Sequence, residues 1–87
     1  MTMTKKATVQ EIGRRTRLKN RDVQLMLETL VEVWTEELVN GGRVEIEHFI
    51  VLNVRTIERT GTQVKFKRRF RTITIHSSRR LRKYLNR

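Results

Sequence analysis

RTIERTGTQVKFKRRFR, the stretch from Arg55 to Arg71, decides the fold of this chain. Seven cations and the single acid Glu58 are interleaved with β-branched residues and Phe, and Thr60-Gly61 interrupts the run. This pattern predicts two strands joined by a turn. A cationic hairpin needs a polyanion as its partner, and the commonest polyanion is nucleic acid. The seven cations are Arg55, Arg59, Lys65, Lys67, Arg68, Arg69 and Arg71.

The net charge of +11 is concentrated around this stretch. Residues 1–54 hold eight basic and eight acidic residues, whereas residues 55–87 hold twelve basic residues and only Glu58. A charge excess confined to one part of the chain favours a binding face more strongly than a high isoelectric point alone.

The chain has 87 residues, enough for a single domain of 1–87 that buries only about 60% of its unfolded surface. It has no Cys, and its only His residues are His48 and His76, so we expect neither a disulfide nor a metal site. Oligomerisation is the remaining usual way to supplement so small a core. We therefore expect a homodimer without cofactors.

Several function classes are disfavoured. No run of 18 apolar residues is present and the first residues lack the apolar segment of a signal peptide, so we expect a cytoplasmic protein that does not span a membrane. Asp22 is the only Asp, and no glycine-rich phosphate loop occurs. We expect no catalytic residues and no small-molecule substrate.

The helical part is expected at about 8–41. Thr8-Val9-Gln10-Glu11 has the form of a capping box that starts a helix reaching about Thr16, with Arg14, Arg15 and Arg17 on its solvated face. Asn20 is expected to cap a second helix that Gly41-Gly42 terminates. Its apolar residues span about 160°, wider than one partner covers, so a second copy of the chain is expected to pack there. The expected dimer core contains Met26, Leu27, Leu30, Val31, Trp34 and Leu38.

The sheet, the basic arm and a last helix are expected at about 43–87. Alternation from Val44 to Val54 predicts a hairpin with His48 as a turn or edge residue, and Thr72 to Ile75 predicts a further strand. Ser77 or Ser78 is expected to cap a helix from Arg79 to Asn86. Basic residues in the first turn of this helix are favourable where an anion docks, and we expect the nucleic acid to contact Arg79, Arg80 and Lys83.

This order of elements resembles the HU and integration host factor family of bacterial DNA-bending proteins. Residues 18–50 follow the second helix and first strand of that family without a gap, and 59–61 match its Arg-Thr-Gly. Residues 79–86 match its closing Lys-x-Leu-Lys-x-x-hydrophobic-Asn pattern. Within the family's Gly-Phe-Gly motif this chain keeps only Phe49, which the resemblance assigns to the dimer core. The arm is about five residues shorter, and the Pro that kinks DNA in the family is missing.

The resemblance implies an α+β fold: an intertwined dimer with two N-terminal helices, a three-stranded antiparallel sheet with an extended β-arm, and a short C-terminal helix. It also implies a nucleoid-associated protein that binds double-stranded DNA with little sequence specificity, in the minor groove. Without the Pro, we expect wrapping or gentle bending of the DNA. RNA or ribosome binding, and docking of an acidic protein or anionic lipid, remain alternative partners for the same cations.

Overall fold

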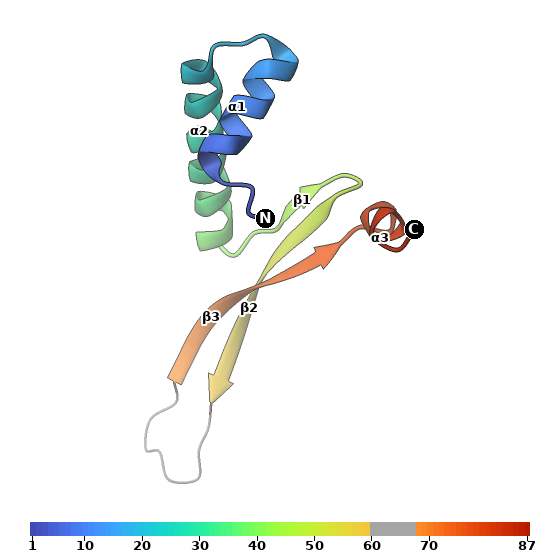
Figure 1. Ribbon diagram of the computed structural model, residues 1–87. Helices are drawn as coiled ribbons and strands as arrows, with labels where there is room; N and C mark the ends of the chain where they lie inside the picture. Colours follow the sequence, from blue (N-terminus) through green and yellow to red (C-terminus); the bar gives the residue numbers. More distant parts are fainter. Residues whose placement is uncertain (60–67) are drawn as a thin grey trace. The chain divides into compact units, whose positions relative to one another are not determined.

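The computed structural model describes residues 1–59 and 68–87. Its elements are α1 (Lys5–Thr16), α2 (Asn20–Val39), β1 (Val44–Ile46), β2 (Ile50–Arg59), β3 (Arg68–Ser77) and α3 (Arg79–Leu85), as Figure 1 shows. The strands form one antiparallel sheet in the order β1-β2-β3. The predicted α+β fold and its element order are thus confirmed.

The chain divides into two compact units, Met1–Thr35 and Glu36–Arg87. The first unit contains α1 and most of α2, and the second contains the end of α2, the sheet and α3. Only three hydrophobic side chains in the described residues are buried: Val9 and Val23 in the first unit and Val44 in the second. The described residues of neither unit form an extensive core of their own.

Helix α1 begins earlier than predicted. Thr4 is its N-cap, with extended backbone angles, and the Thr4 hydroxyl oxygen accepts a hydrogen bond from the Ala7 amide at 3.1 Å. Thr8 lies inside the helix, where its hydroxyl donates to the Thr4 carbonyl. The predicted capping box at Thr8 is therefore wrong, because Thr4 offers the same chemistry one turn earlier and no helix-breaking residue lies between them.

Helix α2 begins at Asn20, whereas Asn20 was predicted as its cap. The Lys19 carbonyl accepts the first helical hydrogen bond, from the Val23 amide at 3.1 Å, so the cap position falls on Lys19. The predicted end at Gly41-Gly42 is confirmed. The Gly41 amide donates to Leu38 and the Gly42 amide to Glu37, and Gly41 has a φ of 81°. These are the two bonds and the left-handed residue of a Schellman motif.

The sheet contains one tight turn among its described residues. Residues 47–49 connect β1 to β2, and His48 adopts a φ of 63° there, in agreement with the predicted turn position. The family resemblance places Gly at this point, and Gly adopts such angles at no steric cost. Strand β3 runs without a break from Arg68 to Ser77, longer than the predicted Thr72–Ile75 segment.

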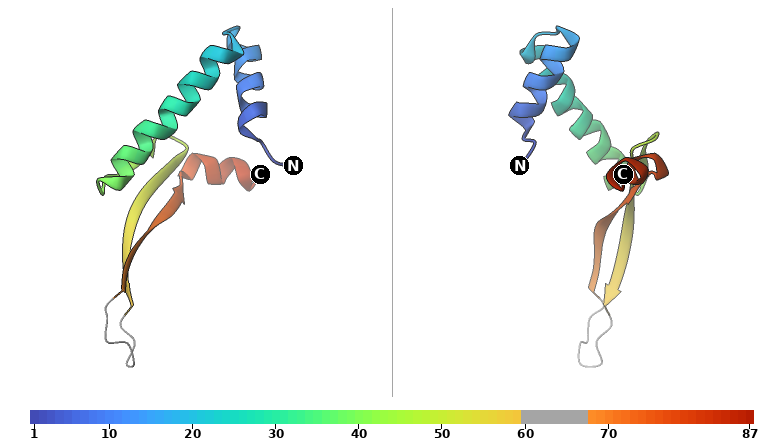
Figure 2. Two further views of the ribbon diagram at one scale, coloured as in Figure 1. Left: turned by 90° about the vertical axis from the view of Figure 1, so that its left-hand side faces the viewer. Right: turned by 45° about the vertical axis from the view of Figure 1, so that its right-hand side comes forward.

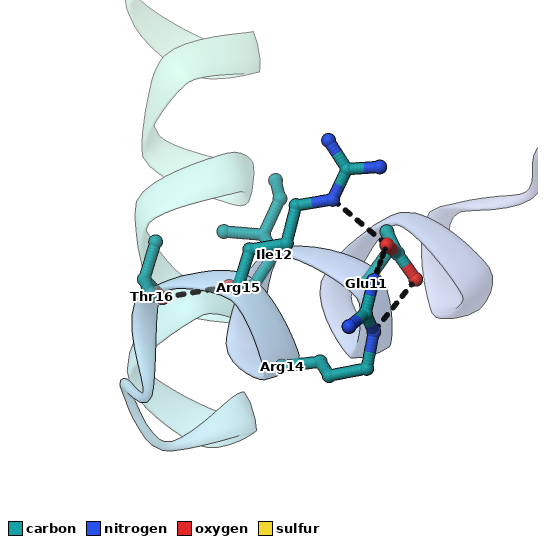
Figure 3. A network of polar contacts seen from close by, with 5 residues as sticks. All are labelled: Glu11, Ile12, Arg14, Arg15 and Thr16. Atoms are coloured by element: carbon teal, nitrogen blue, oxygen red, sulfur yellow. Dashed lines mark hydrogen bonds and ion pairs between the residues drawn. The ribbon is translucent and has the colours of Figure 1, made fainter.

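The outer face of α1 carries a small ionic network, shown in Figure 3. The Glu11 carboxylate accepts hydrogen bonds from Arg14, including one from Nε at 3.3 Å, and from Arg15 Nε at 2.8 Å. All three side chains are substantially exposed, so the predicted solvated role of Arg14 and Arg15 fits their positions. The hydrogen bonds from Arg14 and then Arg15 lower the pKa of Glu11 from 4.5 to about 2.

A lowered pKa makes the contribution of Glu11 to stability depend on pH in a defined direction. The contribution is fully present above pH 4.5, the ordinary pKa, and is lost as the pH falls towards about 2. An NMR titration of the Glu11 side-chain carboxyl carbon should have its midpoint near the lower value. Arg14→Gln should raise that midpoint, whereas Arg21→Gln, on α2, should leave it unchanged. A wild-type midpoint near the ordinary value would contradict the network.

Candidate nucleic-acid interface

The β2–β3 ribbon extends well beyond β1. Strand β1 pairs with β2 only at residues 50–52, whereas β2 pairs with β3 from Ile50↔Ser77 to Arg59↔Arg68. Seven residue pairs, starting at Asn53↔Thr74, therefore form a two-stranded ribbon. At ~3.4 Å per residue this ribbon is about 24 Å long. Figure 1 and the two views of Figure 2 show β2 and β3 as a twisted pair of strands leading away from β1.

The two faces of the ribbon differ in composition. Directly opposed residues share a face, and faces alternate along a strand. Leu52 opposes Ile75 and Val54 opposes Ile73, so one face is apolar where the ribbon leaves β1. The other face presents Arg55 opposite Thr72 and Ile57 opposite Phe70.

The described cations of the arm have different surroundings. Arg55 is exposed on β2. Arg71, on β3, is also exposed, but its guanidinium donates hydrogen bonds to the carbonyls of Leu38 and Val39 at the end of α2. Arg59, Arg68 and Arg69 stand at the far end of the ribbon, in the backbone pairs Arg59↔Arg68 and Glu58↔Arg69. Lys65, Lys67 and the predicted Thr60-Gly61 turn lie outside the described residues.

Phe70 is 42% exposed and stands opposite Ile57, on the face that carries Arg55. The register places its ring on the face opposite the one that carries the apolar residues Leu52 and Val54. The ribbon therefore combines an aromatic residue with a cation on one described surface.

Helix α3 is fixed to the β1–β2 turn through its cap. The Ser78 hydroxyl oxygen accepts from the Leu81 amide at 3.0 Å, and the Ser78 amide donates to the Phe49 carbonyl at 2.7 Å. The predicted cap is thus confirmed and resolved to Ser78. The three predicted contact residues Arg79, Arg80 and Lys83 are all exposed, and the first turn contains no acid.

The helix also forms a basic hollow that sequence reasoning missed. An open cavity of about 580 Å³ is lined by Arg80, Lys83, Tyr84, Asn86 and Arg87. The Arg87 guanidinium lies 4.6 Å from the centroid of the Tyr84 ring, a cation–π distance. Arg87 follows Tyr84 at the third position along the chain, and this spacing, close to one helical turn, would have been the only sequence signal for the contact.

The predicted dimer core is incompletely covered in one chain. Met26, Val31 and Phe49 are each about half exposed, and Leu30 is 39% exposed. The other three predicted residues, Leu27, Trp34 and Leu38, are partly buried. None of the seven is buried as a core residue would be.

The described residues contain neither a metal site nor a membrane-spanning helix. Within 1–59 and 68–87, no three His, Cys, Asp or Glu side chains gather in a way that could hold a metal ion. No helix in this part of the chain is both long and apolar enough to cross a membrane.

Comparisons with known proteins agree with this geometry. DNA-binding protein HU from Thermotoga maritima is 38% identical over 53 residues, which are 61% of this chain and 59% of that relative. The chain thus aligns with less than two thirds of its curated relative.

Two solved structures share the fold. A point mutant of HU from Thermotoga maritima superposes with a TM-score of 0.76 at 23% identity, covering 95% of this chain and 99% of the other. Anabaena HU, in a cocrystal structure with DNA, has a TM-score of 0.74 at 16% identity, covering 95% and 97%.

The family model described as "Bacterial DNA-binding protein" matches residues 3–86, nearly the whole chain. This match agrees with the motifs at 18–50, 59–61 and 79–86 and with the helix pair, sheet and β-ribbon of the structure. The chain therefore belongs to the family of bacterial DNA-binding proteins, of which HU is a member.

Proposed function

We propose that this protein is an architectural double-stranded DNA-binding protein that acts as a homodimer. The observation that carries the proposal is the two-stranded ribbon of β2 and β3, in a chain whose entire charge excess lies at residues 55–87. A ribbon of about 24 Å spans roughly seven base pairs of a duplex, which has one charge per ~1.7 Å of axis. The ribbon and α3 are the surfaces that contact the DNA.

Binding is mainly electrostatic. Arg55 on the ribbon and Arg79, Arg80 and Lys83 on α3 are exposed and neutralise phosphates, which releases condensed counterions from the DNA. Phosphate contacts fix the orientation of the protein but do not read the sequence. The expected result is weak sequence preference and steep salt dependence. The arm runs along the minor groove, as the resemblance to HU and integration host factor implies.

The dimer follows from the exposed apolar surface. Among the residues that the structure describes, Val9, Val23 and Val44 are the only buried hydrophobic side chains, while Met26, Val31 and Phe49 remain about half exposed. Large exposed apolar surfaces on a soluble chain mark interaction sites. A second copy that covers α2 and the apolar face of the sheet would supply the missing core and present two arms to one duplex.

The proposal also covers the domain organisation and the localisation of the protein. One family model covers residues 3–86, which supports a single functional domain. We assign the protein to the nucleoid. Its role there is structural and not catalytic, and it uses neither a cofactor nor a small-molecule substrate.

Dimerisation can be tested by sedimentation equilibrium at micromolar concentration. The protein should sediment at about twice the 10.5 kDa mass of the chain. Val31→Glu places a charge on the apolar surface of α2 and should abolish the dimer, because an unpaired charge is costly to bury. Glu32→Gln, at the next position, is the control and should remain dimeric. A folded wild-type monomer would exclude the intertwined dimer.

The role of the arm can be tested by measuring DNA affinity as a function of salt. Arg55→Gln should weaken binding alike on unrelated sequences, and removing one phosphate contact should flatten the log–log salt slope by about 0.9. Arg14→Gln removes a cation that is already paired with Glu11 and should have little effect. Equal effects of the two substitutions would contradict binding by the arm. A preference for duplex RNA over duplex DNA would favour the alternative partner.

The shape of the bound DNA provides a separate test. The family's wedge residue, Pro, does not occur in this chain, so phosphate neutralisation should produce a smooth bend, at a cost of about 1–6 kcal/mol for a site of 20–30 base pairs. Fluorescence transfer between the ends of a short duplex should show a modest bend and little preference for nicked DNA. A sharp kink that is abolished in Phe70→Ala or Phe66→Ala would show that a phenylalanine has replaced the wedge.

A further inference from the structure

Arg71 connects the root of the arm to the end of α2. It stands on β3 opposite Thr56, and its Nη2 donates to the Leu38 carbonyl at 2.8 Å and to the Val39 carbonyl at 2.9 Å. The last four carbonyls of a helix have no partner within the helix. Arg71 therefore acts as a capping group that is supplied by a strand more than thirty residues later in the chain.

The electrostatics of this helix end favour a cation. The carbonyl end of a helix carries a partial negative charge, which basic residues in the last turn commonly offset. The last turn of α2 has no basic residue, and Glu36 and Glu37 lie near its end. Within the described residues, the guanidinium of Arg71 supplies positive charge to these carbonyls.

One of these two carbonyls, that of Leu38, also belongs to the Schellman motif. The Leu38 carbonyl accepts both from the Gly41 amide at 3.0 Å and from Arg71. An open hollow of about 300 Å³ is lined by Val39, Asn40 and Gly41 at the end of α2 and by Val54, Thr56 and Arg71 of the ribbon. Arg71 thus contacts the turn that ends α2 at the point where the ribbon passes it.

We propose that Arg71 is a positioning residue that fixes the direction of the arm relative to the end of α2, and that it is not one of the phosphate-binding cations. The proposal rests on the proposed DNA-binding function of the arm. A fixed root reduces the conformational freedom that the arm loses on binding, and pre-organisation of this kind strengthens association. Arg55 on β2 lies on the other face of the ribbon and keeps the phosphate-binding role.

The experiment compares Arg71→Gln with Arg55→Gln, two matched substitutions that each remove one exposed arginine from the ribbon. Arg71→Gln should lower affinity for a short duplex about threefold to tenfold at every salt concentration, with the wild-type salt slope. Arg55→Gln should flatten that slope. If Arg71→Gln flattens the slope as much as Arg55→Gln does, Arg71 is a phosphate ligand and the proposal is overturned.

A second measurement needs no DNA. Backbone ¹⁵N order parameters at Thr56 and Thr72 in the free protein should fall in Arg71→Gln and stay at wild-type values in Arg55→Gln. Arg71→Lys keeps the charge but replaces the planar guanidinium with a flexible ammonium group, so it should give intermediate order parameters even if the Gln variant does not fold. Unchanged order parameters in the Lys variant and in a folded Gln variant would overturn the proposal. If the wild-type protein does not bind DNA, the proposed function is contradicted. The order parameters would still show whether Arg71 fixes the root of the arm.

Discussion

The apolar surface that one chain leaves exposed is the constraint on which the rest of the structure depends. A chain of 87 residues with neither Cys nor a cluster of metal ligands in its described part has few ways to supplement a small core. Helix α2 places apolar residues such as Met26 and Val31 on the surface, where their contact with water is unfavourable. Pairing of two chains through this surface would also bring two arms together, so stability and DNA binding would share one cause.

The excess positive charge and the exposed apolar surface of α2 lie in different parts of the chain. Residues 1–54, which include the long helix and the first strand, hold eight basic and eight acidic residues, whereas the ribbon and α3 carry the excess of cations. Because the charge excess lies outside the sequence of α2, two chains can associate through the apolar surface of that helix without pairing the excess cations.

The fold was largely predictable because its signals are local. A few neighbouring residues determine each of these features: the apolar period of α2, the glycines that end it, and Ser78, which caps α3. The start of α1 was misassigned because Thr4 and Thr8 offer the same hydroxyl, and only the backbone distinguishes them. The role of Arg71 could not be predicted, because its partners lie 32 and 33 residues away in sequence and the arm contains six similar cations.

The open edges of the ribbon have a consequence for solubility. Beyond β1, the described residues of β2 pair on one side with β3, and β3 pairs only with β2. Such edges are templates on which strands of other molecules can add, and this is a route to aggregation. Here two arms that approached edge to edge would bring many arginines and lysines together. Mutual repulsion of the DNA-binding charges would therefore keep the arms of different molecules from pairing until a polyanion neutralises them.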